Sequence, residues 1–489
     1  MSSQTEPHTH DVTIAGGGPT GMMLAAELRL RGVDVVVLER EHERSALVRS
    51  LGLHPRSVEI LDMRGLLERF LALGRRYPEG VGRFAGIASP RPVALDSDHA
   101  YILGIPQTVT DRLLEERAVE LGTQVRRGAE VVGFEQDPAS VTVELADGTR
   151  LRSRWLVGCD GGRSTVRKAG GFEFVGTDAE FTGYSIEVDI ADPDQLQPGR
   201  HYTPTGMYTY SRPGTIAMVD FDAGAFHRTE PLTLAHVQSV LRRIAGTDVT
   251  LTALKLATTW TDRAYQATTY RNKRVLLAGD AAHIHSPLGG QGLNLGLGDA
   301  MNLGWKLAAT IRGDAGAGLL DSYSRERHPI GAQVLDWSRA QVALMRPSRS
   351  SRALEAIIRD LIATSDGATY FAERVWAVSL RHDLGDGHPL VGRSAPDFAL
   401  TDGTKLGELL RTGNGLLLDF GARPRLEALA GRWRGRIAYV ASDVRDRLGL
   451  SALLVRPDGV VAWAADAAAD PDQVAQAASR WFGEPDETM

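Results

Sequence analysis

A glycine-rich turn near the amino terminus carries residue types that bind phosphate. The apolar run from Val12 to Ala15 predicts a buried strand, and the sequence GGGPTG follows it. Apolar residues at helical spacing continue to Leu30, and a second apolar strand ends in Glu39. This order of strand, glycine turn, helix, strand and acid is typical of sites that bind a dinucleotide.

The glycines of this turn have different physical roles. Gly16 permits a tight turn, Gly18 lets a pyrophosphate approach the backbone, and Gly21 permits close packing of the helix on the strand. Glu39 is placed to accept hydrogen bonds from a ribose diol. The motif alone is weak evidence, but with its flanking elements it is strong evidence for a cofactor that contains ADP.

A second strand, glycine loop and helix occupies residues 274–308. The strand is followed by Asp280, the loop runs from Pro287 to Gly292, and helical spacing of apolar residues begins at Leu293. Loop amides and the amino end of a helix form a site for electron-rich oxygen atoms. Taken alone, the stretch is equally consistent with an ordinary strand-to-helix connection that uses glycines for its turns.

Three further segments contain groups suited to the same ligand. Asp160 follows a predicted strand and precedes two glycines and a helix start, so it suits a second contact zone for pyrophosphate and ribose. Gln107 opens another segment, and a predicted helix at about 109–121 follows it. The arginines of residues 49–57 are placed to lie over phosphates, although solvated surface arginines are nearly as good an interpretation. Cys159 is the only cysteine, which excludes an intrachain disulfide, and we expect it to be a small core residue.

Length and composition limit the class of protein. The chain has 489 residues, enough for about two to four domains, and a net charge of −6. It has no basic signal for nucleic acid or for stable membrane association and no secretory or membrane-spanning run, so we expect a cytoplasmic protein. His283 and His285 do not indicate a metal site, because no cluster of carboxylates or cysteines accompanies them.

The rest of the chain predicts a β-rich layer, a helical stretch and a separate carboxy-terminal unit. Residues 181–260 alternate apolar and polar side chains, with one helix near 234–244. Residues 390–489 predict strands and then a final helix, in an order that looks thioredoxin-like but lacks redox cysteines. The other expected elements are helices at 319–327, 331–344 and 351–361, strands at 416–420, 437–440, 452–455 and 460–463, and a helix at 471–481.

Three motifs occur in one order along the chain. They are GGGPTG with Glu39, then CDGGRSTVR, then GDAAH followed by a proline, GGQGLN and DAMNLGWKL. Together they resemble the class A flavoprotein aromatic hydroxylases, which have the para-hydroxybenzoate hydroxylase fold, over most of residues 11–345. The sequence of these motifs and their flanking residues more closely resembles the actinomycete polyketide-tailoring hydroxylases and rifampicin monooxygenase. A carboxy-terminal thioredoxin-like domain fits that branch.

The resemblance implies an α/β fold with three parts. A discontinuous, Rossmann-like FAD-binding domain would comprise residues 1–180 and 270–389, with residues 77–102 contributing to the middle sheet. Residues 181–269 would form an inserted substrate-binding β-sheet domain, and residues 390–489 would form the thioredoxin-like domain.

The resemblance also implies FAD as the cofactor, held at residues that match the family motifs. Gln107 would reach the ribitol or pyrophosphate, Asp160 would serve a zone shared by FAD and the nicotinamide nucleotide, and Asp280 would bind the ribitol. Pro287 would lie beside the isoalloxazine, whose pyrimidine edge would meet backbone amides of the loop. The implied cofactor-binding set is Gly16, Gly18, Thr20, Gly21, Glu39, Arg40, Arg49, Gln107, Asp160, Asp280, Pro287, Gly290, Gly292, Leu293 and Asn294.

The implied reaction consumes NADPH or NADH to reduce FAD. Dioxygen then adds at flavin C4a, and the hydroperoxide hydroxylates an aromatic or polyketide-type substrate, while the protein supplies position and a dry pocket. Baeyer–Villiger oxygenation on the same scaffold is one alternative, and a flavin-binding protein without oxygenase activity is another. We expect a monomer or a homodimer.

Large apolar side chains in the β-rich layer are candidates for a substrate pocket next to Pro287. A wide apolar pocket with few polar anchors would suit such a substrate, and core packing is the alternative for each residue. The candidates are Met207, Tyr208, Tyr210, Met218 and Phe221.

The chain departs from the family at Leu51. Relatives commonly have arginine at this position, as in SRGL, where this chain has RSLGL. That arginine is associated with flavin binding, and leucine offers apolar contact only. We therefore expect weakened retention of FAD.

Overall fold

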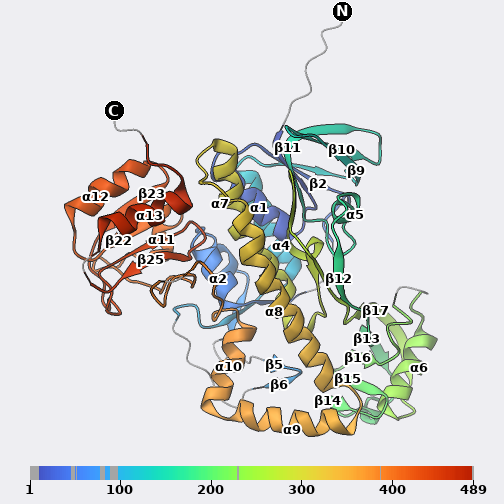
Figure 1. Cartoon of the computed structure of the whole chain (residues 1–489). Helices are drawn as coiled ribbons and strands as arrows, with labels where there is room; N and C mark the ends of the chain where they lie inside the picture. Colours follow the sequence, from blue (N-terminus) through green and yellow to red (C-terminus); the bar gives the residue numbers. More distant parts are fainter. Residues whose placement is uncertain are drawn as a thin grey trace, which may run out of the picture.

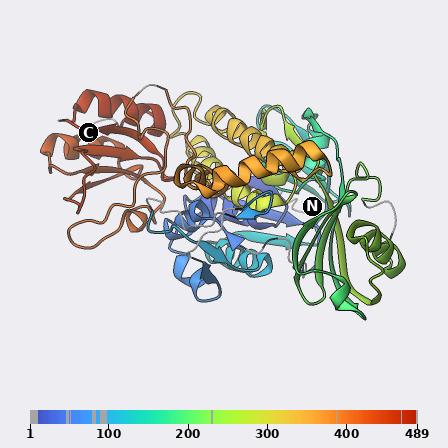
Figure 2. The ribbon, with the colours of Figure 1, turned by 90° about the horizontal axis from the view of Figure 1, so that it is seen from below.

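The computed structural model describes residues 10–45, 50, 52–77, 83–88, 97–227, 231–385, 387–467 and 469–486. An eight-stranded sheet lies in the centre of the molecule (Figure 1). A five-stranded sheet and a four-stranded sheet lie on opposite sides of it, as the view from below also shows (Figure 2). The unit that contains the eight-stranded sheet therefore separates the units that contain the other two sheets.

The central sheet contains the strands that precede the two glycine turns. Its main path is β19-β20-β11-β1-β2-β8, with β1 parallel to both β2 and β11. Strands β1, β2 and β20 are mostly apolar and almost entirely buried, as parallel strands usually are. The bounds of the eight strands are β1 (His10–Ala15), β2 (Val35–Glu39), β8 (Gln124–Arg127), β9 (Val131–Gln136), β10 (Val141–Leu145), β11 (Arg150–Gly158), β19 (Arg271–Asn272) and β20 (Val275–Leu277).

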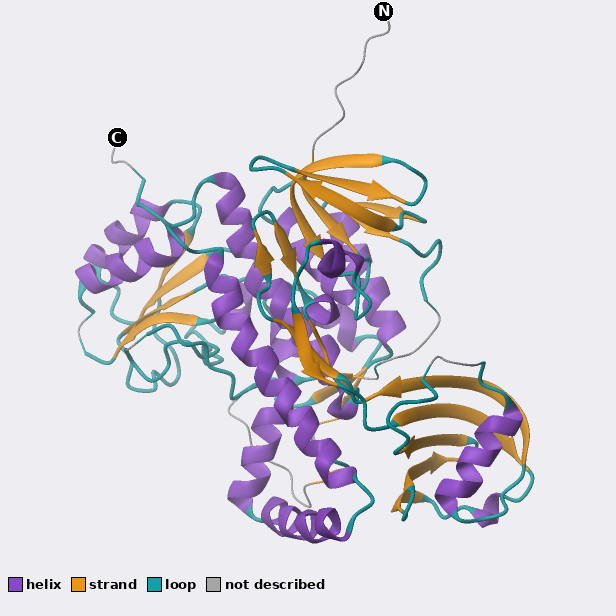
Figure 3. Cartoon of the chain, turned by 45° about the vertical axis from the view of Figure 1, so that its right-hand side comes forward, coloured by secondary structure: helices purple, strands orange, loops and turns teal. Residues whose placement is uncertain are grey.

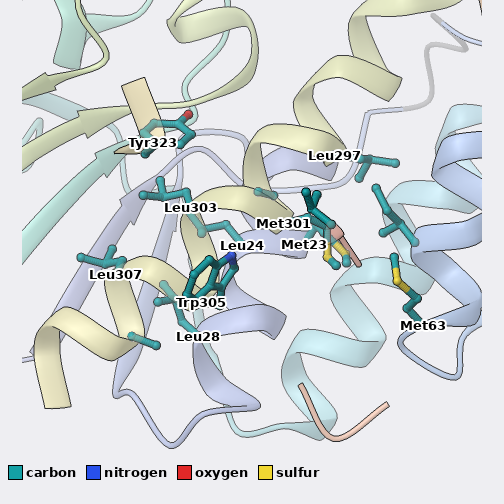
Figure 4. Close-up of a cluster of buried hydrophobic side chains, with 14 of the residues drawn as sticks. Met23, Leu24, Leu28, Met63, Leu297, Met301, Leu303, Trp305, Leu307 and Tyr323 are labelled. Carbon is teal, nitrogen blue, oxygen red and sulfur yellow. The ribbon is translucent and has the colours of Figure 1, made fainter. Parts of the chain in front are cut away.

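Helices α1 (Pro19–Arg29) and α7 (Gln291–Arg312) pack closely against each other. Leu24 and Leu28 of α1 lie beside Leu303 and Trp305 of α7 in the buried core (Figure 4). Gly304 makes this approach possible, because a Cβ there would lie 2.5 Å from the Cβ of Glu27. The two glycine turns that precede α1 and α7 are thereby brought together.

Short elements complete the central unit around these helices. Helix α4 (Gln107–Glu120) packs on α1, and α2 (Pro55–Asp62) packs on α7. The remaining bounds are α3 (Leu67–Leu71), α5 (Thr165–Ala169), β3 (Gly52–Leu53), β4 (Arg75–Tyr77), β7 (Ile102–Gly104), β12 (Phe174–Thr177), β18 (Ala264–Ala267) and β21 (His283–Ile284).

The five-stranded sheet is antiparallel and carries one helix on its outer face (Figure 3). The predicted alternation of residues 181–260 is therefore confirmed, including the helix, which is α6 (Leu234–Ala245). The strands, in spatial order, are β14 (Gly199–Tyr202), β15 (Gly206–Arg212), β16 (Thr215–Asp220), β13 (Thr182–Ile190) and β17 (Leu251–Thr261).

Residues 83–88 form a hairpin of their own. The strands β5 (Arg83–Phe84) and β6 (Ile87–Ala88) pair only with each other among the described strands. The expectation that residues 77–102 contribute to the middle sheet is wrong for this hairpin, which reaches the sheet through side-chain bonds to Ala85 instead of a strand ladder. The other parts of 77–102 lie mainly outside the described residues.

Three helices follow α7, and the first of them crosses the middle of the molecule in Figure 1. The expected helices 319–327 and 331–344 are one continuous helix, α8 (Asp321–Met345), which passes through Pro329. The Gln266 side chain donates to the carbonyl of His328 beside this proline, so a tertiary contact holds the helix at this point. Helices α9 (Arg349–Ala363) and α10 (Ser365–Val375) complete the group.

The carboxy-terminal unit has a four-stranded sheet in the order β23-β22-β24-β25. Strands β22 and β23 are parallel, and the other two pairs are antiparallel. The four strands and the last helix match the predicted elements closely, with β22 (Gly415–Asp419), β23 (Ile437–Ala441), β24 (Ala452–Val455), β25 (Val461–Ala465) and α13 (Pro471–Phe482). Helices α11 (Leu406–Leu409) and α12 (Pro424–Ala430) were not predicted.

No helix within the described ranges combines the length and hydrophobicity needed to cross a bilayer.

Candidate cofactor site and its buried supports

The turn between β1 and α1 excludes side chains on one side and is open on the other. A Cβ on Gly16 would lie 2.3 Å from the carbonyl oxygen of Cys159, and a Cβ on Gly21 would lie 2.1 Å from the carbonyl oxygen of Gly16. Among the described residues, a Cβ on Gly18 would meet nothing within 4 Å, and no side chain caps the start of α1. The free amides at this helix start therefore suit a pyrophosphate.

The predicted ribose acid lies next to this turn. Glu39, at the end of β2, accepts hydrogen bonds from the backbone N–H of Gly17 at 2.7 Å and of Glu41 at 2.9 Å. These bonds fix the carboxylate, and its remaining lone pairs can accept from ribose hydroxyls. Arg40 is exposed instead and pairs with Glu41 on the surface.

Asp160 supplies an acceptor that nothing in the described residues uses. It follows β11, and its Oδ2 accepts a hydrogen bond from the backbone N–H of Val166 at 3.1 Å. Its Oδ1 is buried without a hydrogen-bond partner among the described residues. Because β11 pairs with β1, this orphaned oxygen lies beside the first glycine turn, where a cofactor hydroxyl or phosphate-linked ribose can satisfy it.

Asp280, His285 and Gly292 lie close together in the segment after β20. A Cβ on Gly292 would lie 3.8 Å from Asp280 Oδ1 and 3.6 Å from His285 Nε2. Asp280 is exposed, whereas His285 Nε2 is buried and has no hydrogen-bond partner within the described ranges. Burial lowers the pKa of His285, which favours a neutral ring. The sequence had raised His285 only as a metal ligand, so this contact was missed.

Thr20 joins the two glycine turns. Its Oγ1 would lie 2.7 Å from a Cβ on Gly279 and 2.3 Å from a Cβ on Gly296. Only glycine at both positions lets α1, the turn after β20 and α7 meet at this hydroxyl. Thr20 is therefore a packing contact between the two halves of the site.

The loop before α7 is held by Asn294. Its side-chain Oδ1 accepts from the backbone N–H of His54 at 2.9 Å, and its Nδ2 donates to the carbonyl of Gly290 at 2.8 Å. Pro287 is exposed, and Leu293 packs partly against the core. The loop thus has one face fixed by Asn294 and one face open.

Gln107 lies beside the segment that contains the family departure. Its backbone N–H donates to the carbonyl of Ser50 at 2.9 Å. Arg49 and Leu51 themselves lie outside the described residues.

A buried ionic group beneath the site was missed by the sequence reasoning. We name Asp299, His283 and Arg327 the turn cluster. Asp299 accepts from the backbone N–H of Gly279 at 3.0 Å, from His283 Nε2 at 2.7 Å and from Arg327 Nε at 2.7 Å. Burial favours a raised pKa for Asp299, but Arg327 and His283 outweigh it and hold the pKa below its usual value. His283 is therefore engaged by a carboxylate, and no group of three or more metal-ligating side chains occurs in the described part of the chain.

A second buried ionic group joins the central unit to the carboxy-terminal unit. We name Lys306, Glu326, Arg456 and Asp458 the joint cluster. Arg456 donates to Glu326 at 2.8 and 3.0 Å and to Asp458 Oδ1 at 3.1 Å, while Lys306 pairs with Glu326 at 2.8 Å. Lys306 lies in the quoted motif DAMNLGWKL, but the motif does not reveal its partners.

The candidate substrate residues divide between the two faces of the five-stranded sheet. Met207 and Phe221 belong to a cluster that also contains Leu288 of the glycine loop, which we name the sheet–loop cluster. Tyr208, Tyr210 and Met218 instead pack with α6 on the opposite face. The placement of these three beside the loop is therefore corrected, because successive strand residues point to opposite faces.

Comparisons with known proteins agree with this arrangement. Residues 9–338 match the FAD binding domain family, and residues 388–485 match the carboxy-terminal part of aromatic-ring hydroxylases. A rifampicin monooxygenase from Rhodococcus hoagii is 45% identical over 486 residues, covering 97% of this chain and 98% of that protein.

Solved structures give the same result for the fold. An anhydrotetracycline hydroxylase from Streptomyces rimosus has a TM-score of 0.90 at 39% identity, covering 98% of this chain and 100% of that chain. A Diels–Alderase of pyrroindomycin biosynthesis has a TM-score of 0.83 at 34% identity, covering 97% of this chain and 100% of that chain. The mixed α/β fold of the class A aromatic hydroxylases is thus confirmed, and the chain belongs to the FAD-binding family of flavoprotein monooxygenases of the aromatic-ring hydroxylase type.

Proposed function

We propose that this chain is an NAD(P)H-consuming, FAD-dependent monooxygenase that hydroxylates an aromatic or polyketide-type substrate. The observation that carries the proposal is the pairing of an uncapped, open glycine turn with the orphaned buried Oδ1 of Asp160. FAD, when bound, supplies electron transfer from a reduced nicotinamide and the activation of dioxygen.

The residues around the two turns would hold the cofactor in this proposal. Gly16, Gly18, Gly21 and Glu39 would bind its ADP half, with Asp160 accepting from the ribose or the ribitol. Asp280, Gly292, Leu293 and Asn294 would contact the ribitol and the pyrimidine edge of the ring. The amide groups at the start of α7 stabilise negative charge there, as helix amino ends do.

The substrate would bind between the five-stranded sheet and the glycine loop, beside the sheet–loop cluster. Met207, Phe221 and Leu288 supply apolar surface on that side. An apolar wall excludes water and so protects reactive species from hydrolysis. The other task of the protein would be to hold the substrate in position beside the cofactor.

We also retain the predicted division of the chain into domains. The parallel β22–β23 pair followed by the antiparallel β24–β25 pair supports a thioredoxin-like unit in residues 390–489. The chain's only cysteine, Cys159, lies elsewhere, so the proposed role of this unit is structural. We further propose a cytoplasmic enzyme that is a monomer or a homodimer.

The first experiment measures FAD binding. Protein saturated with FAD and then gel-filtered should retain flavin, and Asp160→Ala should lose it. Asp147→Ala removes an exposed acid from a hairpin turn and is the matched control. Flavin retained equally by both variants would contradict the placement of the cofactor.

The second experiment measures turnover. NADPH consumption should rise when a polycyclic phenol is added, and the product should gain one oxygen atom from ¹⁸O₂. Oxidation of NADPH that no aromatic compound stimulates would overturn the monooxygenase proposal. Ring-opening analysis of the same product separates hydroxylation from Baeyer–Villiger insertion.

A catalyst without oxygenase chemistry is the second candidate. It is favoured by the 34% identity to a Diels–Alderase that covers 97% of this chain. Such an activity would give a product of unchanged mass without NADPH or dioxygen. The two candidates are therefore separated by one mass measurement.

A further inference from the structure

Two buried hydrogen-bond donors in the sheet–loop region lack acceptors in the part of the chain that the structure describes. Trp337 and Gln341 both lie on α8, and the Trp337 ring packs against the sheet–loop cluster. Trp337 Nε1 and Gln341 Nε2 are each buried with no hydrogen-bond partner among the described residues. Buried polar groups in native proteins nearly always have partners, so a pair of unmet donors in one region calls for a ligand.

The chemical character of both atoms is fixed. An indole N–H can only donate. The Gln341 Oε1 accepts the backbone N–H of Ala85 at 3.0 Å, so the atom that remains free is the amide NH₂. Reversing the amide would place that NH₂ against the N–H of Ala85.

The turn that orients Gln341 is itself held in place. The carbonyl of Ala85 accepts from Arg200 Nη1 and from the Tyr202 hydroxyl, each at 2.9 Å. Ala85 has a positive φ of 49°, which is uncommon for a residue other than glycine. The side chains from β14 therefore maintain a strained turn whose N–H keeps the Gln341 donor free.

Trp337 lies beside aromatic rings of the sheet–loop cluster, and Gln341 lies beside the glycine loop. The Trp337 ring centroid is 4.6 Å from that of Phe84 and 5.6 Å from that of Phe371. Gln341 Nε2 is 4.0 Å from the position that a Cβ on Gly289 would occupy. Residues 337 and 341 are one helical turn apart on α8, so their side chains share a face.

We propose that Trp337 and Gln341 anchor the substrate by donating hydrogen bonds to its acceptor oxygens. The substrate class is then a planar aromatic compound that carries carbonyl or phenolate oxygens. The aromatic rings of Phe84 and Phe371 supply apolar contact for its body, and the two donors select its oxygenated edge. This inference rests on the proposed function only for the place where the substrate binds.

The test measures binding to the full chain loaded with oxidised FAD. Equilibrium dialysis gives the affinities for 5-hydroxy-1,4-naphthoquinone and for naphthalene, which differ in acceptor oxygens. Trp337→Phe keeps an aromatic ring without the N–H, and Gln341→Glu keeps an acceptor for Ala85 without the NH₂. Each variant should lower the preference for the quinone by about tenfold.

Trp376→Phe is the matched control. Trp376 is fully buried and its Nε1 also lacks a partner within the described ranges, but it lies outside the sheet–loop cluster. This variant should keep the wild-type preference for the quinone.

An unchanged preference in Trp337→Phe and Gln341→Glu, both retaining FAD, would overturn the proposal. A preference lost equally in Trp376→Phe would also overturn it, because the effect would then be nonspecific. Selective binding without oxygen transfer would leave the anchors supported and the proposed monooxygenase activity refuted.

Discussion

The turn cluster and the joint cluster are both groups of buried ion pairs. Each contains one of two neighbouring residues of α8. Glu326 and Arg327 are neighbours on α8, yet Glu326 binds Arg456 of the carboxy-terminal unit and Arg327 binds Asp299 beneath the cofactor turns. Successive residues of a helix point about 100° apart, so one helix can serve two sides. Helix α8 therefore connects the proposed site to the distant unit.

The two clusters differ in what they hold. In the turn cluster, Asp299 binds the backbone N–H of Gly279, and Arg327 donates to the carbonyl of Leu295 at 3.0 Å. It therefore fixes the backbone of the turn after β20 and of the first part of α7. In the joint cluster, burial lowers the pKa of Lys306 to about 7, and Arg456 meets two carboxylates from separate elements. We infer that the first cluster positions the cofactor and the second holds two units together.

The largest expected effect comes from breaking the joint cluster. Arg456→Leu leaves Glu326 and Asp458 buried without their main partner, which should lower the free energy of unfolding by about 3–5 kcal/mol. Urea unfolding of FAD-saturated protein measures the loss. Arg447→Leu breaks an exposed ion pair in the same unit and should change little. The comparison fails if both variants unfold at the same urea concentration.

Breaking the turn cluster should weaken cofactor binding more than stability. Asp299→Asn keeps the shape of the side chain but removes the charge that faces Arg327, so the Gly279 turn loses its fixed geometry. FAD affinity, measured by fluorescence titration, should fall by about ten- to a hundredfold. Glu326→Gln is the equivalent change in the joint cluster and should keep FAD affinity. Equal losses in the two variants would show that the clusters are not functionally distinct.

A positive charge introduced at Leu51, where the chain departs from its family, tests how tightly the protein binds FAD. Leu51→Arg should tighten FAD binding by about ten- to a hundredfold, because charge-assisted hydrogen bonds contribute about 1.5–3 kcal/mol where desolvated. The protein should then keep FAD through gel filtration that strips the wild-type chain. Leu73→Arg places the same charge at an exposed site and is the control. If wild type already retains FAD through dialysis and the variant binds no better, Leu51 is a neutral replacement.

The smallest expected effect is the loss of folding stability at acid pH that His382, beside the joint cluster, should cause. Burial lowers the pKa of His382 to about 3, although Glu326 favours its protonated form. The unfolded chain takes up this proton below about pH 6.5 and the folded chain does not, so stability is lost as pH falls from about 6.5 towards 3. At pH 5.5 the loss is about 1.4 kcal/mol, and His382→Gln should remove it. An unchanged pH slope in that variant would assign the acid sensitivity to other groups.

Local patterns predicted most elements of both regions. Apolar spacing and turn residues predicted the first glycine turn, the helix observed as α4 and all four strands of the carboxy-terminal sheet. The gap expected between the helices at 319–327 and 331–344 is wrong, because α8 continues through Pro329, where the Gln266 side chain contacts it. Helix α10 was not predicted, and its short apolar pattern follows directly on α9.

The sequence by itself determined the dinucleotide turn, the order of the motifs and the two-faced character of the middle strands. Only the tertiary structure decided which face meets the glycine loop, so Met207 lies toward it while Tyr208 packs under α6. A period of two marks alternate faces but gives no information about what covers them. The buried clusters also appeared only in three dimensions, because Arg456 and Glu326 are 130 residues apart and charges acquire partners only when distant elements pack together.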